Sequence, residues 1–172
     1  MTAVSGLKGV FESQTLELKA GDELKVRQGA SWVVNYGSDG WQDGPNLVVP
    51  KTGTYRVLLL LNPNGAGIIY LDLLQSFSKT IITADVTELQ LDQGASQDVF
   101  LTLSRGIAQN EELCCFCVGS PEAEWIDWGN NELHGPFRIT GKGTGYGVVS
   151  IAVVDKESGV TIDQLDLLVY VR

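Results

Sequence analysis

The sequence has little of the chemistry that most catalytic and metal sites use, with one His, three Cys and one Met in 172 residues. Zinc sites and nucleophile–base pairs usually draw on several His or Cys side chains. Charged residues are also scarce, at 19%. No apolar run approaches the ~20 residues of a membrane-spanning helix. We therefore expect no enzyme, no cofactor, no metal and no membrane insertion.

Positive charge is in deficit as well. The chain has 12 basic and 21 acidic residues, a net charge of -9 and a pI near 4.5. Nucleic-acid binding needs a basic surface, so we expect no nucleic-acid partner. The N-terminus lacks the basic start and apolar run of a secretory signal, so no signal peptide is visible.

Glycine and short apolar stretches are abundant: 20 residues are Gly and 44% are hydrophobic. Leu24 and Val26 alternate with Lys25 and Arg27, which is the pattern of a half-buried strand. The same pattern predicts a strand over residues 31–36, with Trp32 and Tyr36 on one face. No long 3.6-residue apolar period competes, so the sequence predicts an all-β fold.

Length and charge distribution predict two domains. Residues 1–76 carry six basic and seven acidic groups (net -1), and residues 77–172 carry six and fourteen (net -8). Six strands are expected in the first half and about seven in the second, an immunoglobulin-like number. We predict two tandem immunoglobulin-like β-sandwich domains, residues 1–76 and 77–172.

Three segments of the first half resemble a known family: LELKAGDELKVR (16–27), SWVVNYG (31–37) and NLVVPKTGTYRV (46–57). In this order they are similar to a module of the starch-binding outer-membrane proteins of the SusE and SusF type, over residues 11–72. The resemblance implies a β-sandwich that binds a polysaccharide at the cell surface. Unlike those modules, the sequence begins after their first strand and has no lipidation Cys near its start. An unpaired edge is therefore expected, covered by a neighbouring subunit in a homo-oligomer, by the second domain or by another protein.

The second half, over residues 81–171, resembles a bacterial immunoglobulin-like domain in VTELQLDQG (86–94) and ITGKGTGYGVVSI (139–151). Such domains occur in adhesins, in secreted enzymes as spacers, and on bacteriophage virions. At the position where such immunoglobulin-like domains have a strand and a short polar connection, this sequence has residues 122–136, which are expected to form an insertion.

Exposed aromatic side chains can stack on the apolar face of a sugar, and nearby amides and cations bond its hydroxyls. Trp41 is the strongest candidate, because it lies among turn-forming residues. Alternatively, Trp32 and Tyr36 face the core, Asn35 bonds the loop backbone, and Lys25 and Arg27 form a solvated strand face. The candidate glycan-binding residues are Trp32, Asn35, Tyr36, Trp41, Lys25 and Arg27.

An acidic and aromatic segment, residues 122–134, is the second candidate site. Paired carboxylates there could hydrolyse a glycosidic bond, and Asp127, Asn130, Asn131 and Glu132 could bind Ca²⁺. We favour a contact role, with Trp125 and Trp128 as anchors against a partner or the other domain. His134 is interpreted as a hydrogen-bonded loop residue without a functional role.

Cys114, Cys115 and Cys117 are too closely spaced for an ordinary disulfide and point to alternate faces of a strand, which excludes a zinc site. We predict reduced thiols that act as small buried hydrophobes.

The leading hypothesis is a non-catalytic, surface-displayed binding protein that recognises a polysaccharide or cell-surface glycan. The alternative is a structural or decoration protein of a bacteriophage virion that binds capsid or tail proteins. Location follows from this choice: the cell surface in the first case and the virion surface in the second.

Overall fold

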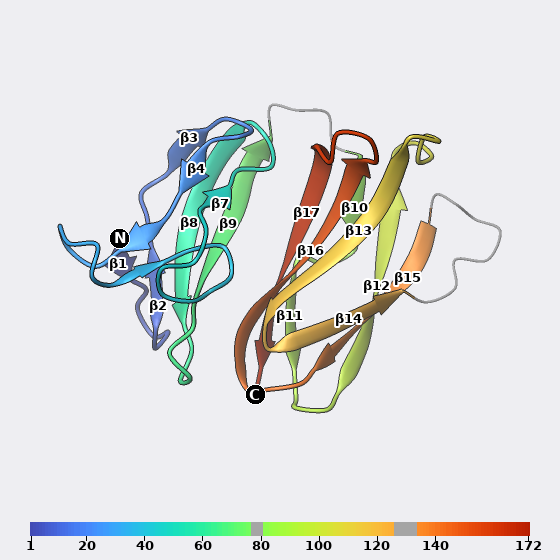
Figure 1. Cartoon of the computed structure of the whole chain (residues 1–172). Coiled ribbons are helices and arrows are strands. Elements are labelled where there is room, and N and C mark those ends of the chain that lie inside the picture. The colour runs from blue at the N-terminus through green and yellow to red at the C-terminus, as the bar shows by residue number, and fades with distance from the viewer. Residues whose placement is uncertain (77–80, 126–133) are drawn as a thin grey trace. The chain divides into compact units, whose positions relative to one another are not determined.

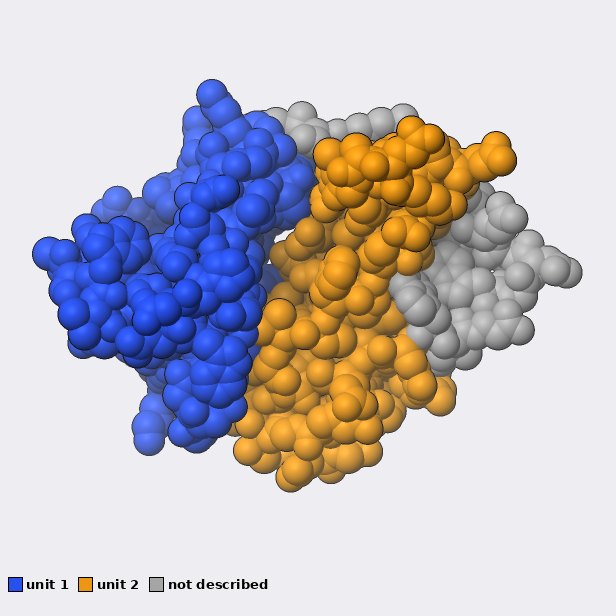
Figure 2. All heavy atoms as spheres, in the orientation of Figure 1, with its two compact units in different colours: residues 1–78 blue, residues 79–172 orange. Residues whose placement is uncertain are grey.

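The computed structural model describes residues 1–76, 81–125 and 134–172. Every regular element within these ranges is a β-strand (Figure 1), which confirms the predicted all-β fold. The same ranges contain no helix long and apolar enough to cross a membrane. The chain divides into two compact units, Met1–Ser78 and Lys79–Arg172 (Figure 2).

Unit 1 is built around one long strand that pairs with three others. The central strand is β8 (Gly53–Leu61), and its neighbours are β2 (Val10–Glu12), β3 (Leu16–Leu18) and β9 (Gly67–Ser76). A fifth strand, β1 (Thr2–Ala3), pairs with β2.

Two short strand pairs form the second layer of unit 1. They are β4 (Glu23–Leu24) with β7 (Leu47–Val48), and β5 (Val26–Arg27) with β6 (Asn35–Tyr36). Their apolar side chains pack onto a core of six buried residues, namely Val49, Tyr55, Val57, Leu59, Ile69 and Leu71. The core therefore lies between the five-stranded sheet and the two short pairs.

The described residues of unit 2, 81–125 and 134–172, form two four-stranded sheets. The first has the order β10 (Ile82–Ala84), β12 (Ser96–Leu103), β15 (His134–Gly141) and β14 (Pro121–Trp125). The second has the order β11 (Glu88–Leu91), β17 (Thr161–Val171), β16 (Gly145–Asp155) and β13 (Glu111–Gly119). All pairs are antiparallel except β11 with β17, which are parallel.

Both sheets of unit 2 contribute to one apolar core. Alternate side chains of β12 and β15 meet those of β16 and β17, as expected for strands that bury one face. The largest of these residues are fully buried, including Phe137, Ile139, Ile151 and Leu167. This shared core makes unit 2 a β-sandwich.

Two buried carboxylates fix the edges of unit 2. Asp163 is 1% exposed, and its Oδ2 accepts hydrogen bonds from the backbone N–H groups of Ile81 (2.6 Å) and Ile82 (2.9 Å). These bonds tie the start of β10 to the opposite sheet. Glu111, at the start of β13, forms a two-pronged ion pair with Arg105 at 2.7 and 2.8 Å. That contact and a bond from the Ala108 N–H lower the pKa of Glu111 to about 2.

Two sequence predictions are wrong. The strand expected over residues 31–36 is reduced to Asn35–Tyr36. The carbonyls of residues 32 and 33 accept hydrogen bonds from the side chains of Asn35 and Gln42, and these bonds take the place of backbone bonds to a neighbouring strand. Residues 121–125, most of them assigned to an insertion, form the regular strand β14 along β15.

Candidate functional site

The strongest candidate site is the loop of residues 28–45 in unit 1, here called the aromatic loop. Its two tryptophans, Trp32 and Trp41, are 58% and 54% exposed. A tryptophan is usually largely buried, because its ring carries a large apolar area. Two such rings on one loop therefore form an unusual amount of accessible aromatic surface.

Polar contacts hold the two halves of the aromatic loop together. Asn35 is 3% exposed, and its Nδ2 donates to the carbonyl of Trp32 (2.8 Å) and to Oδ1 of Asp43 (2.6 Å). Gln42 Nε2 donates to the carbonyl of Val33 at 2.8 Å. These bonds join the segment that carries Trp32 to the segment that follows Trp41. Asn35, predicted as a glycan-binding residue, is instead buried, and its amide holds the loop backbone, as in the alternative interpretation.

Tight turns shape the second half of the aromatic loop. Asp39 Oδ1 accepts the backbone N–H of Trp41 at 2.9 Å, and Asp43 has a positive φ of 62°. Asp tolerates this left-handed conformation better than most residues. The turn therefore presents Trp41 outward from a backbone that is itself hydrogen-bonded.

Arg27 is the cation that the fold brings to this aromatic surface. Its guanidinium carbon lies 4.7 Å from the centre of the Trp32 ring, and Nη1 donates to the carbonyl of Ala30 at 3.3 Å. A guanidinium over an indole is attracted by the ring quadrupole, by about 0.5–1 kcal/mol at an exposed site. Arg27 thereby fixes the ring and places N–H donors beside it.

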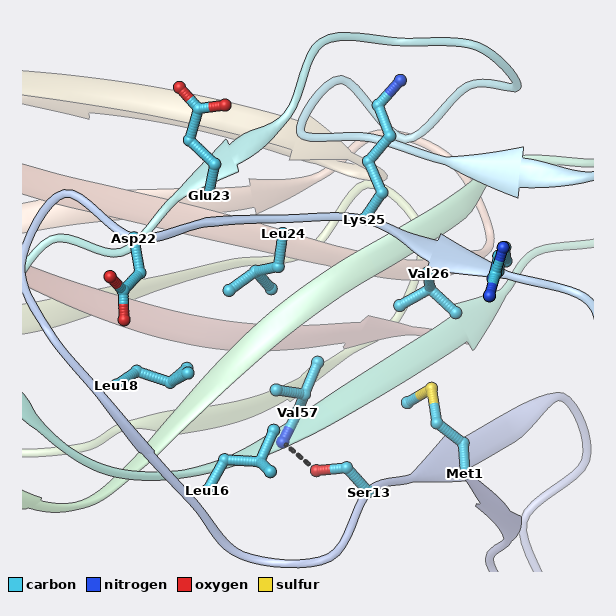
Figure 3. Close-up of a pocket in the computed structure, with 11 residues that line it drawn as sticks. Met1, Ser13, Leu16, Leu18, Asp22, Glu23, Leu24, Lys25, Val26 and Val57 are labelled. Carbon is cyan, nitrogen blue, oxygen red and sulfur yellow. Dashed lines mark hydrogen bonds between the residues drawn. The ribbon is translucent and has the colours of Figure 1, made fainter. Parts of the chain in front are cut away.

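Tyr36 and Lys25 make their contacts elsewhere than at the two tryptophans. Tyr36 packs against the core of unit 1, and its ring covers Gly67 so closely that a Cβ there would meet it at 2.4 Å. The half-buried Lys25 instead lies at the rim of a groove on unit 1, and its side chain points away from it (Figure 3). Of the six predicted residues, Arg27 and Trp32 are in contact, Trp41 is exposed on the same loop, and Asn35 holds the loop backbone.

The groove of unit 1 was not predicted from the sequence. It has a volume of about 440 Å³ and lies between β3, β8 and the β4–β5 segment (Figure 3). Apolar side chains line its interior, and charged residues lie along its rim. The lining includes Leu16, Leu18, Leu24, Val26 and Val57, with Asp22, Glu23, Lys25 and Arg27 among the charged residues. The alternation in residues 22–27 was the signal available in the sequence.

The three cysteines are free thiols on β13, as predicted, but their burial differs from the prediction. Cys114 and Cys115 are half-buried and Cys117 is exposed. A hydrogen bond from Cys115 lowers the pKa of Cys117, whereas that same bond and burial raise the pKa of Cys115. Within the described ranges, no group of His, Cys, Asp and Glu side chains is arranged to hold a metal ion.

The second candidate segment lies largely outside the described residues. That holds for Trp128, the four expected Ca²⁺ ligands and the side chains of Trp125 and His134. Glu122 and Glu124 are exposed on β14, and Glu122 pairs with Lys142 at 3.0 Å. The contact role of Trp125 and Trp128 stays a prediction.

Comparisons with known proteins add little to this geometry. No protein-family model matches the chain, and no curated protein matches it. Among solved structures, it is similar to a crystal structure of domains 4 and 5 of the S-layer protein SbsC. The TM-score is 0.41 with 9% identity, covering 90% of this chain and 99% of that one. A likeness at this level carries no argument about function.

Proposed function

We propose that this chain is a non-catalytic, surface-displayed binding protein that recognises a polysaccharide through the aromatic loop. The observation that carries the proposal is the exposure of Trp32 and Trp41 on a loop whose backbone is fixed by Asn35, Gln42 and Asp39. A fixed loop loses little conformational entropy when a ligand binds. The similarity of residues 11–72 to a SusE/SusF-type module adds to it.

The aromatic loop has the exposed rings and the hydrogen-bonding groups that sugar recognition uses. The apolar face of a pyranose stacks on an indole ring, and its hydroxyls need donors and acceptors at the ring's edge. Arg27 supplies donors beside Trp32, and the backbone groups of the loop supply both kinds. Such a site binds an extended chain from one side, without the cleft that hydrolysis needs.

For unit 2 we infer an immunoglobulin-like fold, and the strand order supports it. If β10 to β17 are taken as strands A, A′, B, C, D, E, F and G, the first sheet reads A-B-E-D and the second A′-G-F-C. An immunoglobulin sandwich has the sheets ABED and CFG. The parallel pairing of β11 with β17 is then that of strand A′ with G. In the proposed function this unit is a spacer that displays unit 1.

Affinity electrophoresis and calorimetry against a panel of soluble glycans test the proposal. We expect binding to at least one glycan, and Trp41→Ala and Trp32→Ala each to weaken it about five- to thirtyfold, as loss of about 1–2 kcal/mol of stacking would. The matched control is Phe100→Ala, an equally exposed aromatic (55%) on unit 2. Absence of binding to every glycan, or equal weakening by Phe100→Ala, contradicts the proposal.

A further inference from the structure

The groove of unit 1 lies beside an unpaired strand edge. Among the described residues, β4 pairs with β7 alone and β5 pairs with β6 alone. The stretch that contains both strands, residues 22–27, is therefore an edge, here called the β4–β5 edge. An exposed edge of this kind is a template for pairing with another strand.

Hydrogen bonds at both ends of this stretch determine which backbone groups face outward. The Val49 N–H donates to the carbonyl of Asp22 (2.8 Å), and the Gln28 N–H donates to the carbonyl of Val34 (2.9 Å). In an antiparallel ladder, residues that bond the neighbouring strand alternate with residues whose backbone groups point away. Asp22 and Gln28 bond inward, so the odd-numbered residues between them direct their N–H and C=O groups to the open side.

Side chains along the β4–β5 edge alternate in the same way. Figure 3 shows Leu24 and Val26 pointing into the groove, and Glu23 and Lys25 pointing away from it. Leu24 and Val26 are only half-buried, and Leu16 on the groove's other wall is 41% exposed. A strand added at this edge would cover apolar surface that unit 1 leaves accessible.

We propose that the β4–β5 edge pairs with the same edge of a second copy of this chain. The ladder is antiparallel, and Leu24 lies opposite Leu24 of the second copy. Glu23 of each copy then lies opposite Lys25 of the other, which gives two ion pairs on the outer face. Opposite charges in such cross-strand positions stabilise a sheet, whereas like charges destabilise it.

Other registers of the same two strands fit less well. A shift by one residue places Leu24 opposite Lys25 and mixes the two faces of the strand. A shift by two residues places Lys25 opposite its own copy in one direction and Glu23 opposite its own copy in the other, so that like charges meet at the twofold axis. The charge order of residues 23–25 thus selects one self-complementary register, which is what a twofold interface requires. A partner with another sequence would not explain that self-complementarity.

Overall charge does not oppose this pairing. The whole chain carries -9, but residues 1–76 carry only -1, so two copies that meet through unit 1 bring nearly neutral surfaces together. A ladder this short buries less than the ~1,200–2,000 Å² of a standard stable interface. The dimer is therefore expected to be weak and to dissociate on dilution.

Sedimentation equilibrium of the full chain, without glycan, from about 1 to about 500 µM measures the dimer directly. We expect the mass to rise with concentration from 18.6 kDa toward twice that value. Lys25→Glu and Glu23→Lys should each weaken association at least about tenfold, because each replaces both ion pairs with like-charge contacts. The double variant Glu23→Lys/Lys25→Glu restores opposite charges and should restore the dimer.

The control is Lys8→Glu, an exposed site of unit 1 with the same change in net charge as Lys25→Glu, which should leave association unchanged. Three results would each overturn the proposal: a wild-type monomer at every concentration, single variants that dimerise like the wild type, or a double variant that stays dissociated. The measurement is independent of glycan binding, so it can fail or succeed separately from the proposed function.

Discussion

Replacing Asp163 should show how much one buried carboxylate contributes to unit 2. Its Oδ2 is the acceptor for two backbone N–H groups, those of Ile81 and Ile82, and its Oδ1 accepts the N–H of Gln164 at 3.0 Å. Asp163→Ala leaves the first two donors buried without this acceptor. A hydrogen bond to a charged group contributes about 1.5–3 kcal/mol, so the loss amounts to about 3–6 kcal/mol.

Asp163→Asn separates the charge from the hydrogen bonds. The amide oxygen can still accept from Ile81 and Ile82, but neutral hydrogen bonds are roughly half as strong as charge-assisted ones. We expect Asn to cost about 2 kcal/mol and Ala about twice that. Because a domain is stable by only about 5–15 kcal/mol, the Ala variant should lose between about a quarter and about four-fifths of the stability of unit 2.

Urea unfolding combined with hydrogen exchange by mass spectrometry is the assay, because a chain of two units need not unfold in one step. Exchange at β10 should accelerate in Asp163→Ala, while exchange at β8 of unit 1 stays unchanged. Asp92→Ala is the control, since its exposed ion pair with Arg172 should contribute only about 0–1 kcal/mol. The reasoning is refuted if Ala costs less than about 1 kcal/mol or if Asn costs as much as Ala.

Two further predictions concern unit 2. The depressed pKa of Glu111, about 2 against an ordinary 4.5, means that its stabilising effect is complete above the ordinary value and is lost as the pH falls toward 2. Glu111→Gln should therefore flatten the acid limb of a thermal-stability profile, and an unchanged limb would contradict the Arg105 pairing. Gly147→Ala should destabilise unit 2 because its Cβ would meet the ring of Pro121 at 2.0 Å, whereas Gly143→Ala, with open space, should not. Thermal unfolding of both variants decides this, and equal midpoints would refute it.

Strands with a clear alternation were predictable from the sequence. Residues 88–91 alternate polar and apolar in the sequence, and they form the strand Glu88–Leu91, whose side chains alternate between exposed and buried. The side chains of residues 31–36 also follow a two-residue pattern in the sequence. The amide of Asn35, however, bonds the carbonyl of Trp32, and only Asn35–Tyr36 pairs with another strand. Pro121–Trp125 was missed because its regular pairing depends on β15, a distant partner that the local sequence does not reveal.

The candidate site was predictable only in part. Trp41 could be placed on a turn because Gly, Asp and Pro surround it. The contact of Arg27 with Trp32 depends on how the intervening turn closes, and the engagement of Tyr36 with the core depends on β9. Such contacts arise from tertiary packing, which periodicity does not specify. The groove and the β4–β5 edge beside it likewise arise from tertiary packing.

The position of β17 governs when unit 2 can fold during synthesis. This strand lies between β11 and β16 in its sheet, and its residues run to Val171. Until those residues have left the ribosome, β11 has no strand to pair with and the core lacks Leu167, Val169 and Val171. Unit 1 has all of its strands much earlier, because its last one ends at Ser76. Unit 1 can therefore fold during translation before β17, a central strand of unit 2, has been synthesised.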